Sequence, residues 1–82
     1  NGVKSHCQAE TARFLSKNLD PDTIKIEDAS IENYSGNNSW YFWTAVTPDG
    51  SRYKCQAFSG DNTRYCRELK INKFKKVKSS GK

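Results

Sequence analysis

The chain has 82 residues, a formal net charge of +5 from 14 Lys+Arg and 9 Asp+Glu, and three cysteines. A chain of this length forms one domain, which excludes two-domain enzymes, doubly wound nucleotide-binding sheets and barrels of strand–helix repeats. It buries only roughly 60% of its unfolded surface, so we expect a small core. No apolar stretch approaches the ~20 residues needed to span a membrane, and the N-terminus has no signal-peptide core. If the protein is exported, we expect that its signal has already been removed.

The positive charge is concentrated at the C-terminus. Six lysines and no acidic residue lie between Lys70 and Lys82, whereas residues 1–69 hold eight basic and nine acidic residues. The sequence therefore predicts one near-neutral domain over residues 1–71 and a basic C-terminal tail over residues 72–82. The tail is either a solvated terminus or a docking segment for an anionic surface.

The first predicted element is a helix over residues 6–17. Ser5 and Gln8 have the spacing of a capping box, in which the two residues satisfy each other's backbone N–H groups. The segment that follows has no Gly or Pro, and positions 7, 11, 14 and 15 share one face at helical spacing. Pro21 prevents continuation of the helix. We expect Cys7 to lie on its buried stripe.

Alternating apolar and polar residues predict a strand over residues 23–27. The alternation then shifts by one residue, because the apolar residues at 24 and 26 have even numbers whereas those at 29 and 31 have odd numbers. A β-bulge near Asp28 would return these side chains to one face. Residues 33–39 form a polar turn cluster, and residues 40–47 have the aromatic and β-branched composition of a strand.

The segment Thr47-Pro48-Asp49-Gly50-Ser51 predicts a hairpin loop, a type I turn with Gly50 in the left-handed position of a bulge. Such a loop places Thr47 opposite Ser51. The residue numbers of any two cross-strand partners in this hairpin then add up to 98. Trp43 falls opposite Cys55 on a face without charge, which we expect to be the core face. The pairs on that face are Ala45/Tyr53, Trp43/Cys55 and Tyr41/Ala57.

The sequence after this hairpin predicts a turn over residues 59–62 and a fourth strand over residues 63–71. A C-terminal helix over the same residues is the alternative, but its apolar stripe is poorer. The predicted fold class is therefore α+β, with one N-terminal helix packed on a three- to four-stranded antiparallel meander.

Three cysteines in a small, loop-rich chain favour an oxidising compartment. A helix packed on the core face would bring Cys7 to Cys55, so we expect a Cys7–Cys55 disulfide. The rival is a Cys55–Cys66 bridge between neighbouring strands. We expect no metal site and no cofactor, because the chain has one histidine and no CxxC cluster. His6 and Cys7 project about 100° apart on a helix, so they do not predict a catalytic dyad.

The other face of the predicted hairpin is the candidate binding surface. Aromatic side chains beside cations are suited to a protein, peptide or glycan partner. The alternative is that a sheet edge, the tail or a dimer partner covers these aromatics. The candidate binding residues are Trp40, Phe42, Arg52, Lys54 and Phe58.

A cysteine in a first helix (Cys7), then strands, then the run W-Y-F-W-T-A-V-T-P-D-G-S-R-Y-K-C-Q at residues 40–56 resembles a pattern of small bacterial exported domains. These resemble the PepSY-type arrangement, a helix lying on an antiparallel sheet. The resemblance covers about residues 5–70. It implies a non-catalytic module that binds a partner or inhibits a protease.

We therefore predict an exported, non-enzymatic binding or inhibitory module, located outside the cytoplasm as a monomer or weak dimer. Its expected partner is a protein or peptide held on the aromatic and basic face of the hairpin over residues 40–58. The alternative is a binder of an anionic surface, nucleic acid or membrane, through the lysine-rich tail.

Overall fold

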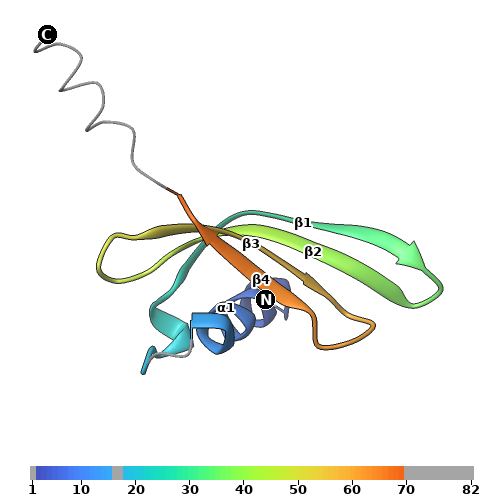
Figure 1. Cartoon of the computed structure of the whole chain (residues 1–82), viewed down its shortest axis with the longest axis horizontal. Helices are drawn as coiled ribbons and strands as arrows, with labels where there is room; N and C mark the ends of the chain where they lie inside the picture. Colours follow the sequence, from blue (N-terminus) through green and yellow to red (C-terminus); the bar gives the residue numbers. More distant parts are fainter. Residues whose placement is uncertain (1, 16–17, 70–82) are drawn as a thin grey trace, which may run out of the picture.

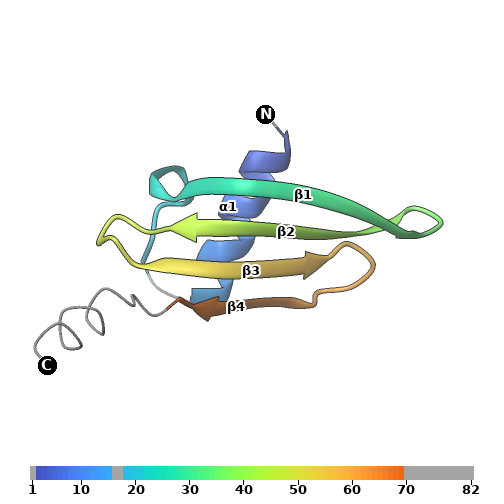
Figure 2. The same cartoon turned by 90° about the horizontal axis from the view of Figure 1, so that it is seen from above.

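The structure is a computed structural model that describes residues 2–15 and 18–69. The chain forms α1 (Gly2–Leu15), a short 3-10 helix η1 (Pro21–Thr23), β1 (Lys25–Ser35), β2 (Asn38–Val46), β3 (Arg52–Phe58) and β4 (Arg64–Glu68). The strands form one antiparallel sheet in the order β1-β2-β3-β4. Helix α1 lies on one face of this sheet (Figure 1) and crosses its strands (Figure 2). The predicted α+β meander is thus confirmed, whereas the predicted tail over residues 72–82 lies outside the described residues.

Helix α1 begins about one turn before its predicted start. It starts at Gly2, so Ser5 lies within the helix rather than at its cap. Val3 is half-buried against the core, and its position four residues before Cys7 extends the buried stripe by a turn. This packing explains the earlier start. Cys7 on this stripe is fully buried, as predicted, and so is Thr11, whereas Phe14 and Leu15 are partly buried against the core.

The predicted bulge in β1 is present. Glu27 pairs with Thr44 and Ser30 pairs with Phe42, so one extra residue is inserted between them. Asp28 has a φ of 53°, in the left-handed region. Because of this insertion, Ile26 and Ile31 both lie opposite core-face residues of β2, as the shift in the apolar alternation requires.

The β2–β3 hairpin has the predicted register at all its pairs, including Trp43 opposite Cys55. The Thr47 N–H donates to the Ser51 carbonyl and the Gly50 N–H donates to the Thr47 carbonyl, both at 2.9 Å. Gly50 has a φ of 91°. The turn residues at positions 47–51 therefore determine the register of the two central strands of the sheet.

Several strand boundaries differ from the predictions. The strand predicted from residue 23 begins at Lys25, because Pro21–Thr23 forms η1. The predicted turn over residues 33–39 is mostly strand, because β1 continues to Ser35 and β2 starts at Asn38. Gly36, with a φ of 57°, permits this two-residue turn. Strand β4 covers less than the predicted residues 63–71, and residues 70 and 71 lie outside the described part of the chain.

A small core fills the space between α1 and the sheet. Among the described residues, its buried members are Cys7, Ile24, Trp43, Ala45, Tyr53, Cys55, Ala57 and Cys66. Polar groups are buried beside them and are paired: the Trp43 Nε1–H donates to Thr11 Oγ1, and the Thr11 hydroxyl donates to the Cys7 carbonyl, each at 2.8 Å. The buried Glu10 carboxylate pairs with Arg64 of β4 and thereby connects the helix to the edge strand.

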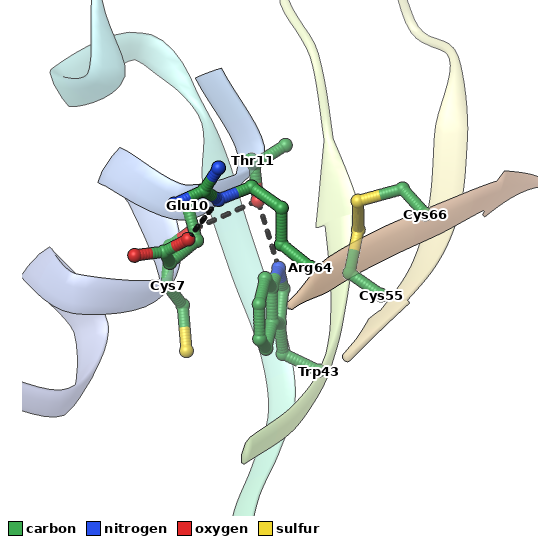
Figure 3. Close-up of a disulfide and its surroundings, with 7 residues drawn as sticks. All are labelled: Cys7, Glu10, Thr11, Trp43, Cys55, Arg64 and Cys66. Atoms are coloured by element: carbon green, nitrogen blue, oxygen red, sulfur yellow. Dashed lines mark hydrogen bonds and ion pairs between the residues drawn. A yellow bond between two sulfur atoms is a disulfide. The ribbon is translucent and has the colours of Figure 1, made fainter. Parts of the chain in front are cut away.

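The predicted Cys7–Cys55 bridge is wrong. The disulfide joins Cys55 to Cys66, which is the rival pairing between neighbouring strands. Cys55 and Cys66 are register partners on β3 and β4, with Cα atoms 4.0 Å apart. Packed layers are roughly 10 Å apart, whereas bridged cysteines usually have Cα atoms within about 6.8 Å of each other. Figure 3 shows the Cys7 thiol on the helix, away from the disulfide.

The sequence contained a signal for the observed bridge. The Phe58 N–H donates to the Thr63 carbonyl and closes a four-residue loop at the predicted turn over residues 59–62. This closure makes paired positions on β3 and β4 sum to 121, which places Cys55 opposite Cys66. The polar cluster at residues 59–62 predicts this turn, and the register that its length imposes on the fourth strand distinguishes the Cys55–Cys66 pairing from Cys7–Cys55.

Candidate functional site

The sheet face opposite α1, here called the outer face, carries no helix or strand among the described residues (Figure 1). Side chains on this face alternate with core side chains along each strand. The cross-strand pairing arranges them in four rows. In order along the sheet, the rows are Lys25/Val46/Arg52, Glu27/Thr44/Lys54/Arg67, Ser30/Phe42/Gln56 and Glu32/Trp40/Phe58. Tyr65 pairs with Gln56, but its ring meets Phe14 of α1 edge-on at 5.7 Å and so does not belong to this face.

Aromatic rings gather at the end of the outer face near the β1–β2 turn. The Trp40 ring lies 5.0 Å from the Phe58 ring and 6.1 Å from the Phe42 ring, measured between centroids. Tyr34 meets Phe58 edge-on at 5.4 Å and is 68% exposed. We call Tyr34, Trp40, Phe42 and Phe58 the aromatic cluster. The last three are half-buried although no element covers them, because the rings pack against one another.

The opposite end of the outer face is charged. Arg52 donates to Glu27 at 2.9 Å, and Lys25 lies 3.7 Å from the same carboxylate. Lys54 and Arg67 face each other across β3 and β4. We call the first two rows, which hold these residues, the basic end, because they carry four cations and one carboxylate.

The structure places all five predicted binding residues on the outer face, in two groups. Trp40, Phe42 and Phe58 form one cluster, whereas Arg52 and Lys54 belong to the basic end. Position 54 is four residues from position 58 on the same strand, so the two groups lie ~13 Å apart. Their function in binding stays a prediction.

Sequence reasoning missed two residues of this surface. The polar composition of residues 33–39 predicts a turn at Tyr34, but β1 extends through Tyr34 to the edge of the aromatic cluster. Arg67 comes to Lys54 through the β3–β4 register. The four-residue loop at residues 59–62 was the available signal for Arg67, and the glycine at position 36 was the signal for a tighter turn beyond Tyr34.

The helix side of the sheet holds the groups with the chemistry of a nucleophile or base. Burial, with a smaller contribution from the nearby Glu10 carboxylate, raises the pKa of the Cys7 thiol to about 11. A thiol with this pKa is protonated at neutral pH and is a poor nucleophile. The His6 ring packs against the Tyr41 ring, with centroids 4.6 Å apart.

Within residues 2–15 and 18–69, no group of three or more His, Cys, Asp or Glu side chains is placed to hold a metal ion. The same residues include no helix that is long and apolar enough to cross a membrane. Comparison of the chain with protein-family models, curated proteins and solved structures finds no match. The resemblance to PepSY-type domains therefore stays a prediction.

Proposed function

We propose that this protein is a non-enzymatic binding or inhibitory module of an extracytoplasmic compartment, and that the outer face contacts a protein or peptide partner. The observation that carries the proposal is the aromatic cluster on a sheet face that no described element covers. Grouped aromatic rings bury much apolar area and lose little side-chain entropy on binding, which is why they dominate many interfaces.

The location outside the cytoplasm is supported by the Cys55–Cys66 disulfide. Disulfides persist in oxidising compartments and are rare in the cytosol, and small secreted domains use them to supplement a small core. The non-enzymatic part is supported by the buried, high-pKa thiol of Cys7. Neither point identifies the partner.

Site-specific photo-crosslinking tests the binding face. A benzoylphenylalanine is introduced at Gln56, in the centre of the outer face, and separately at Ile31, which is 46% exposed and faces the helix side of the sheet. Each full chain is irradiated in the envelope fraction and in the culture fluid of the source cells. We expect a discrete crosslinked protein with the Gln56 variant and none with the Ile31 variant.

The substitution Trp40→Ser in the Gln56 variant completes the test. It removes the central ring of the aromatic cluster, which contacts Phe42 and Phe58, without changing the core face. We expect the crosslinked partner to disappear. A crosslink that persists in Trp40→Ser, that forms equally at Ile31, or that never forms at Gln56 would overturn the proposal.

A further inference from the structure

Two cations are register partners on the outer face. Lys54 lies opposite Arg67, and like charges placed directly opposite each other destabilise a sheet. Along an antiparallel pair of strands, hydrogen-bonded residue pairs alternate with non-hydrogen-bonded pairs, whose Cα atoms are closer together. The neighbouring Cys55/Cys66 pair has the short Cα distance, 4.0 Å, of a non-hydrogen-bonded pair. Lys54/Arg67 is therefore a hydrogen-bonded pair, with Cα atoms ~5.5 Å apart. The fold itself gains nothing from this arrangement, whereas a bound anion would relieve the repulsion.

The carboxylate on the same row is already neutralised. Glu27 lies on the row of Lys54 and Arg67 but is paired with Arg52 and Lys25. In the described part of the chain, no carboxylate pairs with Lys54 or Arg67. The basic end therefore has two cations available for an external carboxylate.

Charge at the two ends of the outer face differs in sign. The basic end has four cations and one carboxylate, whereas Glu32 is the charged residue on the row of Trp40 and Phe58. Positive charge is thus concentrated at one end of the face.

This distribution favours an acidic peptide over a polyanion. Nucleic acid that stacked its bases on Trp40 would bring phosphates to Glu32, and an anionic membrane would place its charge over the whole face. A peptide can instead carry its apolar and acidic groups at different positions. Side chains at i and i+4 of an extended peptide project to one side, ~13 Å apart, which matches the separation of Phe58 from Lys54.

We propose that the outer face docks an acidic segment of a partner protein in extended conformation. A large apolar side chain lies on the aromatic cluster, and carboxylates about four residues along the segment pair with Lys54 and Arg67. This inference rests on the binding function proposed above and specifies the chemistry of the partner.

Fluorescein-labelled, serine-based peptides test this spacing directly. Each contains one leucine and a pair of glutamates at a variable separation, and the controls contain glutamine in place of glutamate. Binding to the full chain is measured by fluorescence anisotropy at low and high salt. We expect the peptide with a separation of four to bind about tenfold more tightly than its glutamine control, and added salt to remove the difference.

Substitutions in the protein test which of its residues cause the preference for glutamate over glutamine peptides. Lys54→Glu/Arg67→Glu should abolish the preference for glutamate, whereas Lys4→Glu, a charge reversal on the exposed side of α1, should leave it unchanged. Trp40→Ser should weaken binding of both glutamate and glutamine peptides. Short duplex DNA and phosphatidylserine vesicles serve as competitors, and we expect neither to displace the peptide as well as unlabelled peptide does.

The outcomes separate this inference from the proposed function. Equal binding of glutamate and glutamine peptides, both lost in Trp40→Ser, would overturn the acidic preference and leave the docking face intact. Absence of peptide binding, or stronger binding of DNA or vesicles that depends on Lys54 and Arg67, would also overturn the inference. The crosslinking at Gln56 decides the proposed function independently of these results.

Discussion

Cys7 is a fully buried thiol whose ionisation opposes folding. Its ordinary pKa is 9.0, and burial followed by the Glu10 carboxylate raises the pKa to about 11 in the folded chain. Because the folded pKa is the higher one, the stabilising effect of the protonated thiol is complete below pH 9 and disappears as the pH rises through 11. The full effect of such a shift is of the order of 2–3 kcal/mol.

We therefore expect alkaline destabilisation that depends on Cys7. The free energy of unfolding, measured with urea at pH 8 and near pH 11, should fall by more in the natural chain than in Cys7→Ala. For each protein, only the change in unfolding free energy between the two pH values is compared. The cavity that Cys7→Ala creates does not affect this comparison, since its effect is present at both pH values. Parallel pH profiles for the two proteins would contradict the prediction.

The buried hydrogen bonds between α1 and β2 give a second expectation at the residue scale. The Trp43 Nε1–H donates to Thr11 Oγ1 at 2.8 Å, and both residues are buried. Thr11→Val retains the shape but leaves the indole N–H without an acceptor, so we expect a loss of about 1–3 kcal/mol in unfolding free energy. In a Trp43→Phe background the same substitution should have a clearly smaller effect. Additive effects in this double-mutant cycle would contradict a coupled hydrogen bond.

At the scale of elements, the disulfide joins β3 to the edge strand β4. Its cysteines are separated by 11 positions, so in the chain-entropy model the bridge contributes about 3 kcal/mol. We expect Cys55→Ala/Cys66→Ala to lower the unfolding free energy by up to this amount, measured by urea unfolding. Alkylation of the natural chain supplies the control: one thiol should react after unfolding without reductant, and three after reduction. Two further reactive thiols before reduction would contradict the bridge.

The bulge in β1 determines which face its side chains occupy. Asp28 adopts a left-handed backbone conformation, with a φ of 53°, which β-branched residues avoid. We expect Asp28→Val to lower the unfolding free energy by about 1–2 kcal/mol and Asp28→Gly to be nearly neutral. Thermal unfolding of the two variants measures the difference. An equal loss in both would show that the side chain of Asp28, rather than its backbone conformation, matters.

The elements differ in how well the sequence predicts them, for physical reasons. The β2–β3 register follows from a local turn that Pro48 and Gly50 specify, and the bulge follows from a slip in apolar alternation. The choice between the two cysteine pairings is harder to predict, because it depends on the spacing between helix and sheet and on a register that must be extended across a second loop. The position of Arg67 opposite Lys54 depends on the same register, so it follows from the sequence only when the loop over residues 59–62 is used to extend the pairing into β4.

On the scale of the whole molecule, the two faces of the sheet have different roles. One face packs on α1, and the core that results has few large side chains, chiefly Ile24, Trp43 and Tyr53. The pairing of Glu10 with Arg64 and the Cys55–Cys66 bridge both tie the edge strand to this core. The outer face contributes little to the core, so its aromatic and charged side chains can change without loss of the fold.

The β1–β2 hairpin extends beyond the helix, as Figure 2 shows. Residues 28–37 are all exposed, whereas the centre of β2 and β3 is buried beneath α1. We therefore expect two classes of backbone amide in hydrogen exchange. The amides of Trp43, Ala45 and Cys55 should exchange through global unfolding, and those at the far end of the hairpin through local opening of lower free energy.

Exchange measured by NMR at increasing urea concentration distinguishes the two classes. Amides near Trp43 should show the full urea dependence of global unfolding, and those near Glu32 a weaker one, because local opening exposes less surface. The chain with Cys55→Ala/Cys66→Ala is the control, since loss of the bridge should lower the protection of the first class and leave the second unchanged. A single urea dependence for both groups would mean that the aromatic cluster lies on a fully cooperative sheet, and that the outer face is rigid along its whole length before any partner binds.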